Sequence, residues 1–343
     1  MQYEVTIGIP VYRAVNYIEK TMESALSQSY PNIEFLILDD CGKDGSMDVV
    51  ERLQKEHPRG KDIRILRHDK NYGIGIARNR ILDEAQGKYL FFLDSDDIIN
   101  NDTIQILIDE VQKIDADIVY GSWDRIDIID KTPPVQSIYP YMQFTKDDEL
   151  AMYAFKNYSS FRISVCNCLM NLKFIRSHNL RFIDAIFWED MAFTYELVTK
   201  VRRAVLLAKI TYHYLCRSNS LSHYQIRELL TKSEIMDNVM VLDYLKNKSK
   251  QFKNKTYLSY YCYNLEMNSF YTVCYILKYY QRIVPKPSYD EMTRILAHPI
   301  GIWEISQFRD KLFHNLFFWL LGHLPSSCSI IIVRLIGKIK KAI

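Results

Sequence analysis

The sequence contains little that would form a linker, a metal cage or a leader segment. Only 11 of its 343 residues are glycine and 10 are proline, so long flexible linkers are not expected. Its seven cysteines are irregularly spaced, without a Cys-x-x-Cys pair or a Cys/His cluster of zinc spacing, which predicts reduced thiols. The first residues are neither basic nor apolar enough to predict a signal peptide.

An excess of charge of one sign is also nearly absent. The 44 Lys and Arg residues almost balance 41 Asp and Glu residues, and the net charge of +3 is too small to indicate a nucleic-acid-binding surface. Hydrophobic residues make up 48% of the chain and charged residues 25%, which excludes a disordered or fibrous protein. The 25 Tyr and 16 Phe residues are concentrated in the C-terminal half, so we expect the two halves to have different roles.

The first 125 residues alternate between strand and helix patterns. Apolar runs predict strands over residues 5–10, 33–38, 63–66, 89–93 and 118–120, and apolar residues at helical spacing predict helices over 16–29, 46–56, 76–86 and 103–114. The nearly continuous apolar run at 33–38 is typical of a strand that is buried on both faces of a parallel sheet. This order indicates an α/β fold with a mostly parallel, helix-covered sheet and right-handed crossovers.

The alternation ends at Pro133 and Pro134. Residues 147–200 are expected to form helices around a loop, and residues 204–216 a strand or a hairpin. From Tyr224 onward the pattern predicts helices rich in Tyr, Leu and Lys.

Acids and glycines gather where the expected strands end. Ligands of open α/β sheets bind at the carboxyl ends of the strands. The segments that follow the first four strands are 10–12, 39–46, 71–79 and 94–97, and three of them carry acids or glycines directly after an apolar strand. The sequence therefore predicts a binding site at this edge of the sheet.

The strongest of these signals is the segment Asp94-Ser95-Asp96-Asp97. Three carboxylates within four residues repel one another unless a cation or a basic side chain lies among them. A cluster of oxygen ligands suits Mg²⁺ or Mn²⁺, which also accept oxygens from the phosphates of a substrate. The alternative is a helix N-cap with solvated charges, since Asp is favoured at that position.

Other residues of this edge give weaker signals. Asp39 is suited either to bind a nucleobase or ribose or to accept hydrogen bonds from turn amides. Gly73 and Gly75, taken alone, indicate a plain turn. Arg78 is expected in the first turn of a helix, where a cation opposes the helix dipole, so we expect an anionic partner, either Asp94 or a phosphate.

Several motifs occur in the order and at the intervals seen in a known family. They are Ile7–Tyr12, Asp39–Asp40 with Asp44–Ser46, Asn71–Gly73 with Ala77–Asn79, Gly87–Tyr89 and Phe92–Asp97. Together they resemble the nucleotide-sugar-binding half of family-2 glycosyltransferases, which have the Rossmann-like GT-A fold and invert the anomeric centre. The resemblance covers residues 3–125 closely and extends weakly to about residue 222.

This resemblance implies contacts to a nucleotide sugar. Pro10 and Tyr12 would border the nucleobase, and Asp39 would bind uracil or its equivalent. The residues expected near the ribose and the phosphates are Arg78, Asp94 and Ser95.

The resemblance also implies the catalytic groups. Asp96 would hold a divalent cation, Mn²⁺ or Mg²⁺, that bridges the diphosphate. Trp188-Glu189-Asp190 resembles the later acidic motif of the family, in which the final residue, Asp190, would be the catalytic base. The alternative is that these acids only begin a helix. The segment that closes over the pyrophosphate would include Tyr214, Arg217, Ser220 and Ser222, although Arg217 also fits a surface charge.

The chain departs from the family pattern in two places. Cys166-Asn167-Cys168 stands where many relatives carry Trp or Gly followed by Lys, so the acceptor side is expected to differ. No Gln-x-x-Arg-Trp segment follows Asp190. Processive synthases of the family carry this segment, and its absence favours the addition of a single sugar.

The resemblance implies an inverting glycosyltransferase that moves one sugar from a nucleoside diphosphate sugar, with UDP-sugar favoured, to a glycan or lipid-linked acceptor of cell-surface polysaccharide synthesis. Such a displacement needs a base for the acceptor hydroxyl and a Lewis acid for the leaving diphosphate. One alternative is a sugar nucleotidyltransferase, but Pro10–Arg13 lacks the glycine-rich basic loop expected after its first strand. The other is a membrane-associated protein that binds nucleotide sugars without catalysis.

The expected organisation is a GT-A domain over residues 1–222, with a nucleotide-sugar half at 1–125 and an acceptor half at 126–222, followed by a helical region at 223–343. Residues 312–333 lack Asp, Glu, Lys and Arg, but Pro325 divides them into halves too short to span a membrane. They predict amphipathic helices whose basic end is attracted to anionic lipid at the cytoplasmic face of the plasma membrane. The alternative is packing on the protein's own core or against a second copy in a homodimer.

Overall fold

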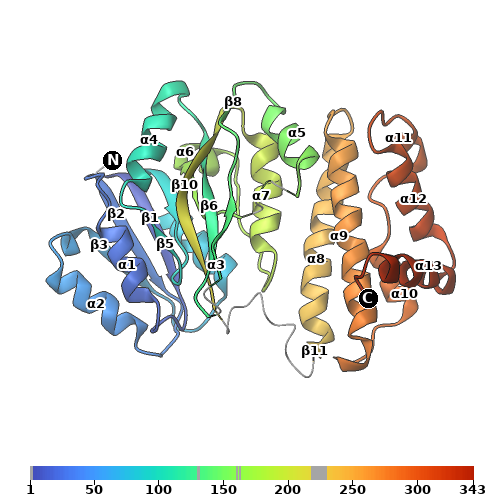
Figure 1. Cartoon of the computed structure of the whole chain (residues 1–343), viewed down its shortest axis with the longest axis horizontal. Helices are drawn as coiled ribbons and strands as arrows, with labels where there is room; N and C mark the ends of the chain where they lie inside the picture. Colours follow the sequence, from blue (N-terminus) through green and yellow to red (C-terminus); the bar gives the residue numbers. More distant parts are fainter. Residues whose placement is uncertain (1–2, 130–131, 160, 162–163, 218–229) are drawn as a thin grey trace. The chain divides into compact units, whose positions relative to one another are not determined.

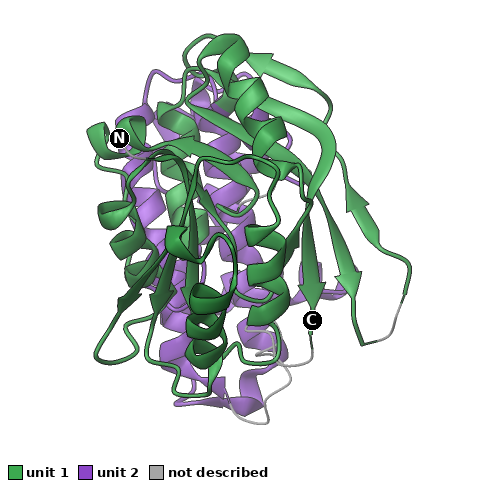
Figure 2. Ribbon diagram, turned by 90° about the vertical axis from the view of Figure 1, so that its left-hand side faces the viewer, with its two compact units in different colours: residues 1–150, 160–184, 189–220 green, residues 151–159, 185–188, 221–343 purple. Residues whose placement is uncertain are grey.

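The chain folds into two compact units. The computed structural model describes residues 3–129, 132–159, 161, 164–217 and 230–343. One unit comprises residues 1–150, 160–184 and 189–220, and the other comprises residues 151–159, 185–188 and 221–343 (Figure 2). The domain boundary expected at residue 222 lies outside the described residues, as do Ser220 and Ser222.

A ten-stranded sheet forms the centre of the first unit (Figure 1). Its strands are β1 (Tyr3–Val11), β2 (Ile33–Asp39), β3 (Ile63–Arg67), β4 (Gly87–Phe92), β5 (Ile98–Ile99), β6 (Ile118–Asp127), β7 (Val135–Ser137), β8 (Met142–Phe144), β9 (Cys168–Asn171) and β10 (Ala204–Cys216). The main path runs β3-β2-β1-β4-β9-β6-β10-β5, while β7 pairs with β6 and β8 with β10. The flanking helices are α1 (Ile18–Leu26), α2 (Ser46–Glu56), α3 (Ile74–Glu84), α4 (Thr103–Ile114), α6 (Leu172–Ser177) and α7 (Glu189–Lys200).

The predicted mostly parallel α/β sheet is confirmed, and it contains four short strands that were not expected, β5, β7, β8 and β9. Strands β1 to β4 pair in parallel, and so do β6 and β10. Between these two groups lies β9, which is antiparallel to both β4 and β6. Its four residues, Cys-Leu-Met-Asn, are few and carry no β-branched side chain, so nothing local separated them from the helices expected over 147–200. Residues 204–216 form one strand rather than a hairpin.

The parallel register brings the ends of the N-terminal strands to one edge. Val11 of β1 is paired with Asp39 of β2, and Asp39 is paired with Arg67 of β3. Parallel strands share their carboxyl-terminal edge, so the segments after β1, β2 and β4 meet there. The edge expected from the sequence to carry the chemistry is therefore formed.

Helix α3 begins two residues earlier than expected, and glycines explain why. Gly73 precedes the helix with φ of +90°, a backbone conformation that only glycine adopts without strain. A Cβ on Gly75 would lie 2.6 Å from the carbonyl oxygen of Ile183, so the helix start lies against the 183 backbone. As a result Arg78 is the fifth residue of α3 and not part of its first turn.

The second unit is helical, as predicted, with one small addition. Its helices are α5 (Glu149–Lys156, from residue 151 onward), α8 (Lys232–Ser249), α9 (Leu258–Lys278), α10 (Tyr289–Ile295), α11 (Ile302–Ser306), α12 (Leu312–His323) and α13 (Ser326–Ile339), of which α8 and α9 lie side by side (Figure 1). Two short strands, β11 (Leu230–Thr231) and β12 (Ile283–Val284), pair in parallel. Among the described residues, no helix is both long and apolar enough to cross a membrane.

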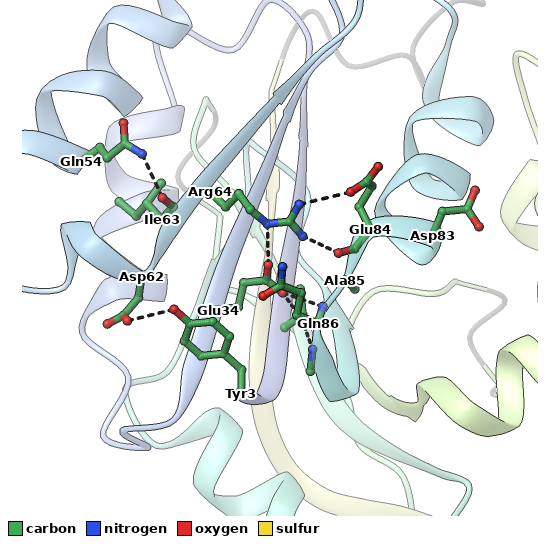
Figure 3. Close-up of polar contacts among 12 residues, drawn as sticks. Tyr3, Glu34, Gln54, Asp62, Ile63, Arg64, Asp83, Glu84, Ala85 and Gln86 are labelled. Atoms are coloured by element: carbon green, nitrogen blue, oxygen red, sulfur yellow. Dashed lines mark hydrogen bonds and ion pairs between the residues drawn. The ribbon is translucent and has the colours of Figure 1, made fainter. Parts of the chain in front are cut away.

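A buried carboxylate joins the strands at the edge of the sheet opposite the expected site. The Glu34 side chain on β2 is 1% exposed and accepts hydrogen bonds from Thr6 Oγ1 at 2.6 Å and from the Gln86 amide at 2.9 Å. Arg64 Nε on β3 lies 2.8 Å from Glu34 Oε1, and the same guanidinium reaches Glu84 (Figure 3). The run at 33–38, read from the sequence as nearly all apolar, thus hides a structural ion pair.

Replacing Glu34 by Ala should destabilise the first unit by about 3–5 kcal/mol, because it removes the buried partner of Arg64 and leaves the Thr6 hydroxyl and the Gln86 amide without their acceptor. Urea unfolding would measure the loss. The matched control is Glu51→Ala, which removes an exposed pair with Arg67 and should cost less than about 1 kcal/mol. Equal effects of the two changes would contradict the structural role of Glu34.

Candidate active site

The segments after β1 and β2 supply one exposed ring and one carboxylate. Pro10 is buried within β1, and Tyr12, just beyond the strand, is 40% exposed. The Arg13 guanidinium lies 5.2 Å from the centre of the Tyr12 ring. Asp39 ends β2, and its Oδ1 accepts a hydrogen bond from the Cys41 amide at 2.9 Å. Among the described residues, the other Asp39 oxygen accepts no hydrogen bond from the turn, so this carboxylate keeps capacity for a further donor.

The neighbouring Asp40 has a purely structural arrangement. It is 3% exposed and accepts hydrogen bonds from the backbone amides of Tyr72 and Gly73, both at 3.0 Å. His68 Nδ1 lies 2.7 Å from its Oδ1. Asp40 therefore fixes the turn that precedes α3. Of the motif Asp39-Asp40, only Asp39 remains a candidate for binding a ligand.

Each of the three acids after β4 has its own partners. Asp94 Oδ1 lies 2.9 Å from Arg78 Nη2, and Asp96 Oδ2 lies 2.6 Å from Arg217 Nε. Asp97 is 1% exposed and accepts hydrogen bonds from the Tyr212 hydroxyl at 2.6 Å and from the Leu215 amide at 2.9 Å. These acids do not cap a helix, because β5 follows them and α4 begins only at Thr103. Basic side chains lie among the acids, as their mutual repulsion requires.

Burial and mutual repulsion disfavour the ionised forms of the two later acids. The pKa of Asp96 is raised by burial and by the charge of Asp94, although Arg217 opposes the shift. The pKa of Asp97 is raised further, by burial and then by the charges of Asp96 and Asp94. An added cation would therefore stabilise the ionised carboxylates of this segment.

The guanidinium of Arg78 joins the strand-end acids to the later acidic motif. Arg78 is 4% exposed; its Nη1 donates to Glu189 Oε1 at 2.7 Å and its Nη2 to Asp94 Oδ1 at 2.9 Å. The rings of Phe92 and Phe182 lie 5.9 and 5.6 Å from it. Although burial favours the neutral form, the charges of Asp94 and Glu189 hold the pKa of Arg78 above its ordinary value. The expected anionic partner of Arg78 is therefore Asp94, together with a second carboxylate.

Glu189 and Asp190 are the first two residues of α7. Glu189 is buried, and burial followed by the charge of Asp190 raises the pKa of Glu189 to about 7, despite the opposing charge of Arg78. Because Asp190 is the next residue in the chain, the contact between Arg78 and Glu189 brings Asp190 toward the edge that carries Asp94. The acids begin a helix, and one of them also has a long-range partner.

Arg217 lies over an aromatic ring that the sequence did not single out. Its guanidinium carbon is 4.9 Å from the centre of the Tyr17 ring, and its side chain is 20% exposed. A surface charge was the alternative for Arg217, but its contact with Asp96 places it at the edge.

The oxygens of Asp94 and Asp96 are the ligand type that Mg²⁺ and Mn²⁺ prefer. Within the described residues, no group of three or more His, Cys, Asp or Glu side chains is arranged to hold a metal ion. A divalent cation here would depend on one or two carboxylates and on phosphate oxygens of a ligand, which is how Mg²⁺ is commonly bound. Binding through Asp96 Oδ2 would require Arg217 to release that oxygen.

A hollow elsewhere in the first unit is a poorer candidate for the active site. It has a volume of about 610 Å³ and is lined in part by Asp117 and Arg203, which directly precede β6 and β10. These are the amino ends of two parallel strands, opposite to the edge where α/β sheets bind ligands. Arg203 also forms ion pairs with Asp115 and Asp117.

Comparison with known proteins identifies the family of this chain. The sequence profile of Glycosyl transferase family 2 matches residues 6–177, half of the chain. The chain belongs to glycosyltransferase family 2. The match includes Asp39, Arg78, Asp94 and Asp96. Glu189, Asp190 and Arg217 lie beyond it.

The relatives of this glycosyltransferase include bacterial proteins that are themselves named as glycosyltransferases. TuaG of Bacillus subtilis, assigned to teichuronic acid biosynthesis, is 34% identical over 146 residues, which cover 43% of this chain and 56% of TuaG. GlyG of Streptococcus pneumoniae is 31% identical over 36% of this chain and 40% of its own length. The chain thus spans little more than half, or less, of these two relatives. The Escherichia coli glucosyltransferase WfaP is 27% identical over 68% of this chain and 86% of its own length.

The fold of this glycosyltransferase is also found in a solved structure. The crystal structure of Staphylococcus aureus TarS residues 1–349 with UDP-GlcNAc aligns with a TM-score of 0.65 and 15% identity, over 93% of this chain and 89% of TarS. At that identity the likeness establishes the fold, which is the GT-A-like α/β sheet with an added helical region.

Sequence reasoning missed residues that assemble this site from a distance. Asn167, part of a motif noted only as a departure, donates to the backbone oxygens of Gly121 and Ser122 and accepts from Thr211 Oγ1 at 2.7 Å. It therefore ties β6 to β10. The ring of Tyr17 and the hydroxyl of Tyr212 support Arg217 and Asp97. No local signal marks these residues, because each acts on a partner far away in the sequence.

Two glutamate carboxyls should titrate near pH 7, because burial raises the pKa of both Glu189 and Glu266 to about 7. Carbon NMR of the protein labelled at glutamate carboxyl carbons would show two such resonances. One should be missing in Glu189→Gln and the other in Glu266→Gln. The prediction fails if every glutamate resonance titrates below pH 6.

The same pKa shift makes a prediction for stability. Below pH 4.5 both folded and unfolded Glu189 are protonated, and between pH 4.5 and about 7 only the folded form keeps the proton. The stabilising contribution of this group is therefore lost as pH rises through that window. Between those values the wild type should lose about 1–3 kcal/mol more unfolding free energy than Glu189→Gln, as measured by urea unfolding at each pH. Parallel pH profiles would contradict it.

Proposed function

We propose that this family-2 enzyme transfers a single sugar, with inversion, from a UDP-sugar to a glycan or lipid-linked acceptor in the assembly of a bacterial surface polysaccharide. The observation that carries the proposal is the bridge formed by Arg78 between Asp94 and Glu189. This bridge brings the donor-side acids and the motif containing Asp190 to the same edge of the sheet, so one site offers both a diphosphate-binding side and a base.

The donor side is proposed to bind the nucleotide through residues after β1, β2 and β4. The exposed Tyr12 ring, next to Pro10, offers a surface for stacking a nucleobase. Asp39 is suited to accept hydrogen bonds from uracil, and Ser95 and Arg78 from the next segments would lie toward the ribose and phosphates. UDP is favoured because TarS is solved with UDP-GlcNAc and WfaP is named as a UDP-glucose enzyme.

Asp190 is proposed as the catalytic base. The acceptor hydroxyl oxygen attacks the anomeric carbon, the bond from that carbon to the diphosphate breaks, and the hydroxyl proton passes to the Asp190 carboxylate. Attack opposite the leaving group inverts the anomeric centre. Arg78 pairs with Glu189, which directly precedes Asp190 in the chain.

Asp96, with Asp94 beside it, is proposed to hold Mn²⁺ or Mg²⁺. The cation would supply Lewis-acid stabilisation of the departing diphosphate. Burial and the charge of Asp94 disfavour an ionised Asp96, which supports a cation at this position. Arg217 pairs with Asp96 in this structure and is proposed to contact the diphosphate once a cation takes that oxygen.

The acceptor and the place of action are also proposals. WfaP is named for a diphosphoundecaprenol-linked acceptor, which supports a lipid-linked acceptor here. The chain is proposed to consist of a GT-A domain over residues 1–222, with a nucleotide-sugar half at 1–125 and an acceptor half at 126–222, and a helical region over 223–343. The helical region is proposed to contact the cytoplasmic face of the plasma membrane through α12 and α13.

Asp190→Asn should reduce transfer by at least about 10³-fold while leaving UDP binding within about twofold, because the amide cannot accept the hydroxyl proton. Transfer is measured as UDP release with acceptor, and binding by calorimetry. The control is Glu196→Gln, the same change six residues later on α7, which should remain active. Normal turnover of Asp190→Asn would exclude Asp190 as the base. Tight UDP-sugar binding without any transfer by the wild type would favour a binding protein.

Asp96→Asn should weaken Mn²⁺-dependent UDP binding at least about tenfold, because it removes the charge proposed to hold the cation. Calorimetry of UDP with Mn²⁺, and with EDTA in its place, measures this without turnover. The matched control is Asp102→Asn, which alters an exposed carboxylate paired with Lys209 and should bind normally. Equal UDP affinity of the wild type with Mn²⁺ and with EDTA would overturn the metal proposal.

A further inference from the structure

A hollow in the second unit is apolar on its walls and basic on its rim. It has a volume of about 300 Å³ and lies between α9, α12 and α13. Its lining includes Tyr263 and Met267 of α9, Phe313 and Phe317 of α12, Ile336 of α13, and Lys340. The volume is at the lower end of the range of small-molecule sites. The hollow therefore suits a slender apolar group more than a bulky ligand.

The surface around this hollow is unusually apolar for one that faces solvent. Phe313 is 82% exposed and Leu320 51% on α12, and Leu335 is 59% and Ile339 82% exposed on α13. Several large apolar side chains exposed on two neighbouring elements of one unit are typical of an interaction site. By their lengths, α12 extends over about 18 Å and α13 over about 21 Å, so each can lie along a bilayer surface with one face in the lipid.

The charge of the segment has a single sign. After Asp310 the sequence contains no acid, and its basic residues are Lys311, Arg334, Lys338, Lys340 and Lys341. None of these five forms an ion pair with a carboxylate in the part of the chain that the structure describes. The Lys311 ammonium lies 4.2 Å from the centre of the Tyr263 ring, which lines the hollow, and Lys340 lines it directly.

We propose that this hollow binds one acyl chain of an anionic phospholipid, with Lys340 and Lys311 pairing with the lipid phosphate. The apolar walls match the chain, and the unpaired ammonium groups match the headgroup. A second copy of the chain fits poorly, because the same face would bring five like charges against five others. The inference rests on the proposed membrane contact and adds a specific lipid site to it; it is independent of the transfer reaction.

Adjacent lysines provide a test with vesicles. Sedimentation with phosphatidylcholine vesicles should show little binding, and 30% phosphatidylglycerol should give strong binding. Lys340→Gln should weaken that binding at least about tenfold, and Lys341→Gln, the same change one residue away and outside the hollow, about fivefold or less. Equal losses would show attraction by the basic end alone and would overturn the site in the hollow.

A soluble lipid tests the hollow without a bilayer. Dihexanoyl phosphatidylglycerol, kept below its micelle concentration, should bind the wild type saturably by calorimetry and raise its melting temperature. Met267→Trp, which fills the hollow, should weaken this binding at least about tenfold, and Ile331→Trp, an exposed change on α13 outside it, should not. Phe313→Ser gives a second variant that removes an exposed wall residue. The absence of saturable binding to the wild type would overturn the proposal.

Two controls separate this proposal from its rivals. UDP binding should stay unchanged in Met267→Trp and Phe313→Ser. If the wild type failed to bind UDP but still bound the lipid, the result would count against the proposed function and not against the lipid site. Light scattering after size exclusion reports the oligomeric state. A wild-type dimer that becomes monomeric in Phe313→Ser would show that the face binds a second copy, and it would overturn the lipid site.

Discussion

The buried guanidinium of Arg78 is the charge on which the acidic edge of the sheet depends. It forms ion pairs with Asp94 from the strand end and with Glu189 from the start of α7, and its guanidinium lies 5.9 and 5.6 Å from the rings of Phe92 and Phe182. Buried carboxylates without such a partner would be protonated or excluded from the interior. With this one side chain in place, two acidic segments separated by 95 positions, 94 and 189, can share a site.

The two edges of the sheet use acids in opposite ways. At the amino edge, Glu34 is matched by Arg64 and by two neutral donors, so its charge serves stability. At the carboxyl edge, burial and mutual repulsion raise the pKa of Asp96 and of Glu189, even with Arg78 and Arg217 present. That edge is short of positive charge, which is the electrostatic condition under which a divalent cation would stabilise it.

The second unit buries its own charges and leaves apolar surface outside. Lys246 and Glu266 pair at 2.9 Å in its core, and the lysine also donates to the carbonyl oxygens of Ile295 and Ala297. Tyrosines such as Tyr257 and Tyr261 are buried there as well. The unusual feature is the apolar face of α12 and α13 beside lysines that form no ion pair within the described residues, because a solvent-exposed surface rarely combines these two properties.

The sequence by itself determined the alternation of strands and helices, the exact span of α2 and α4, and the positions of the acids that follow β2 and β4. These features depend on local periodicity and on residues next to strand ends, which a reader can take directly from the chain. Only the tertiary structure decided that β9 enters between β4 and β6, that Asp97 is held by Tyr212, and that Arg78 reaches Glu189. These pairs are separated by 115 and 111 residues. Their formation depends on which strands become neighbours in the sheet, and local sequence patterns do not encode that choice.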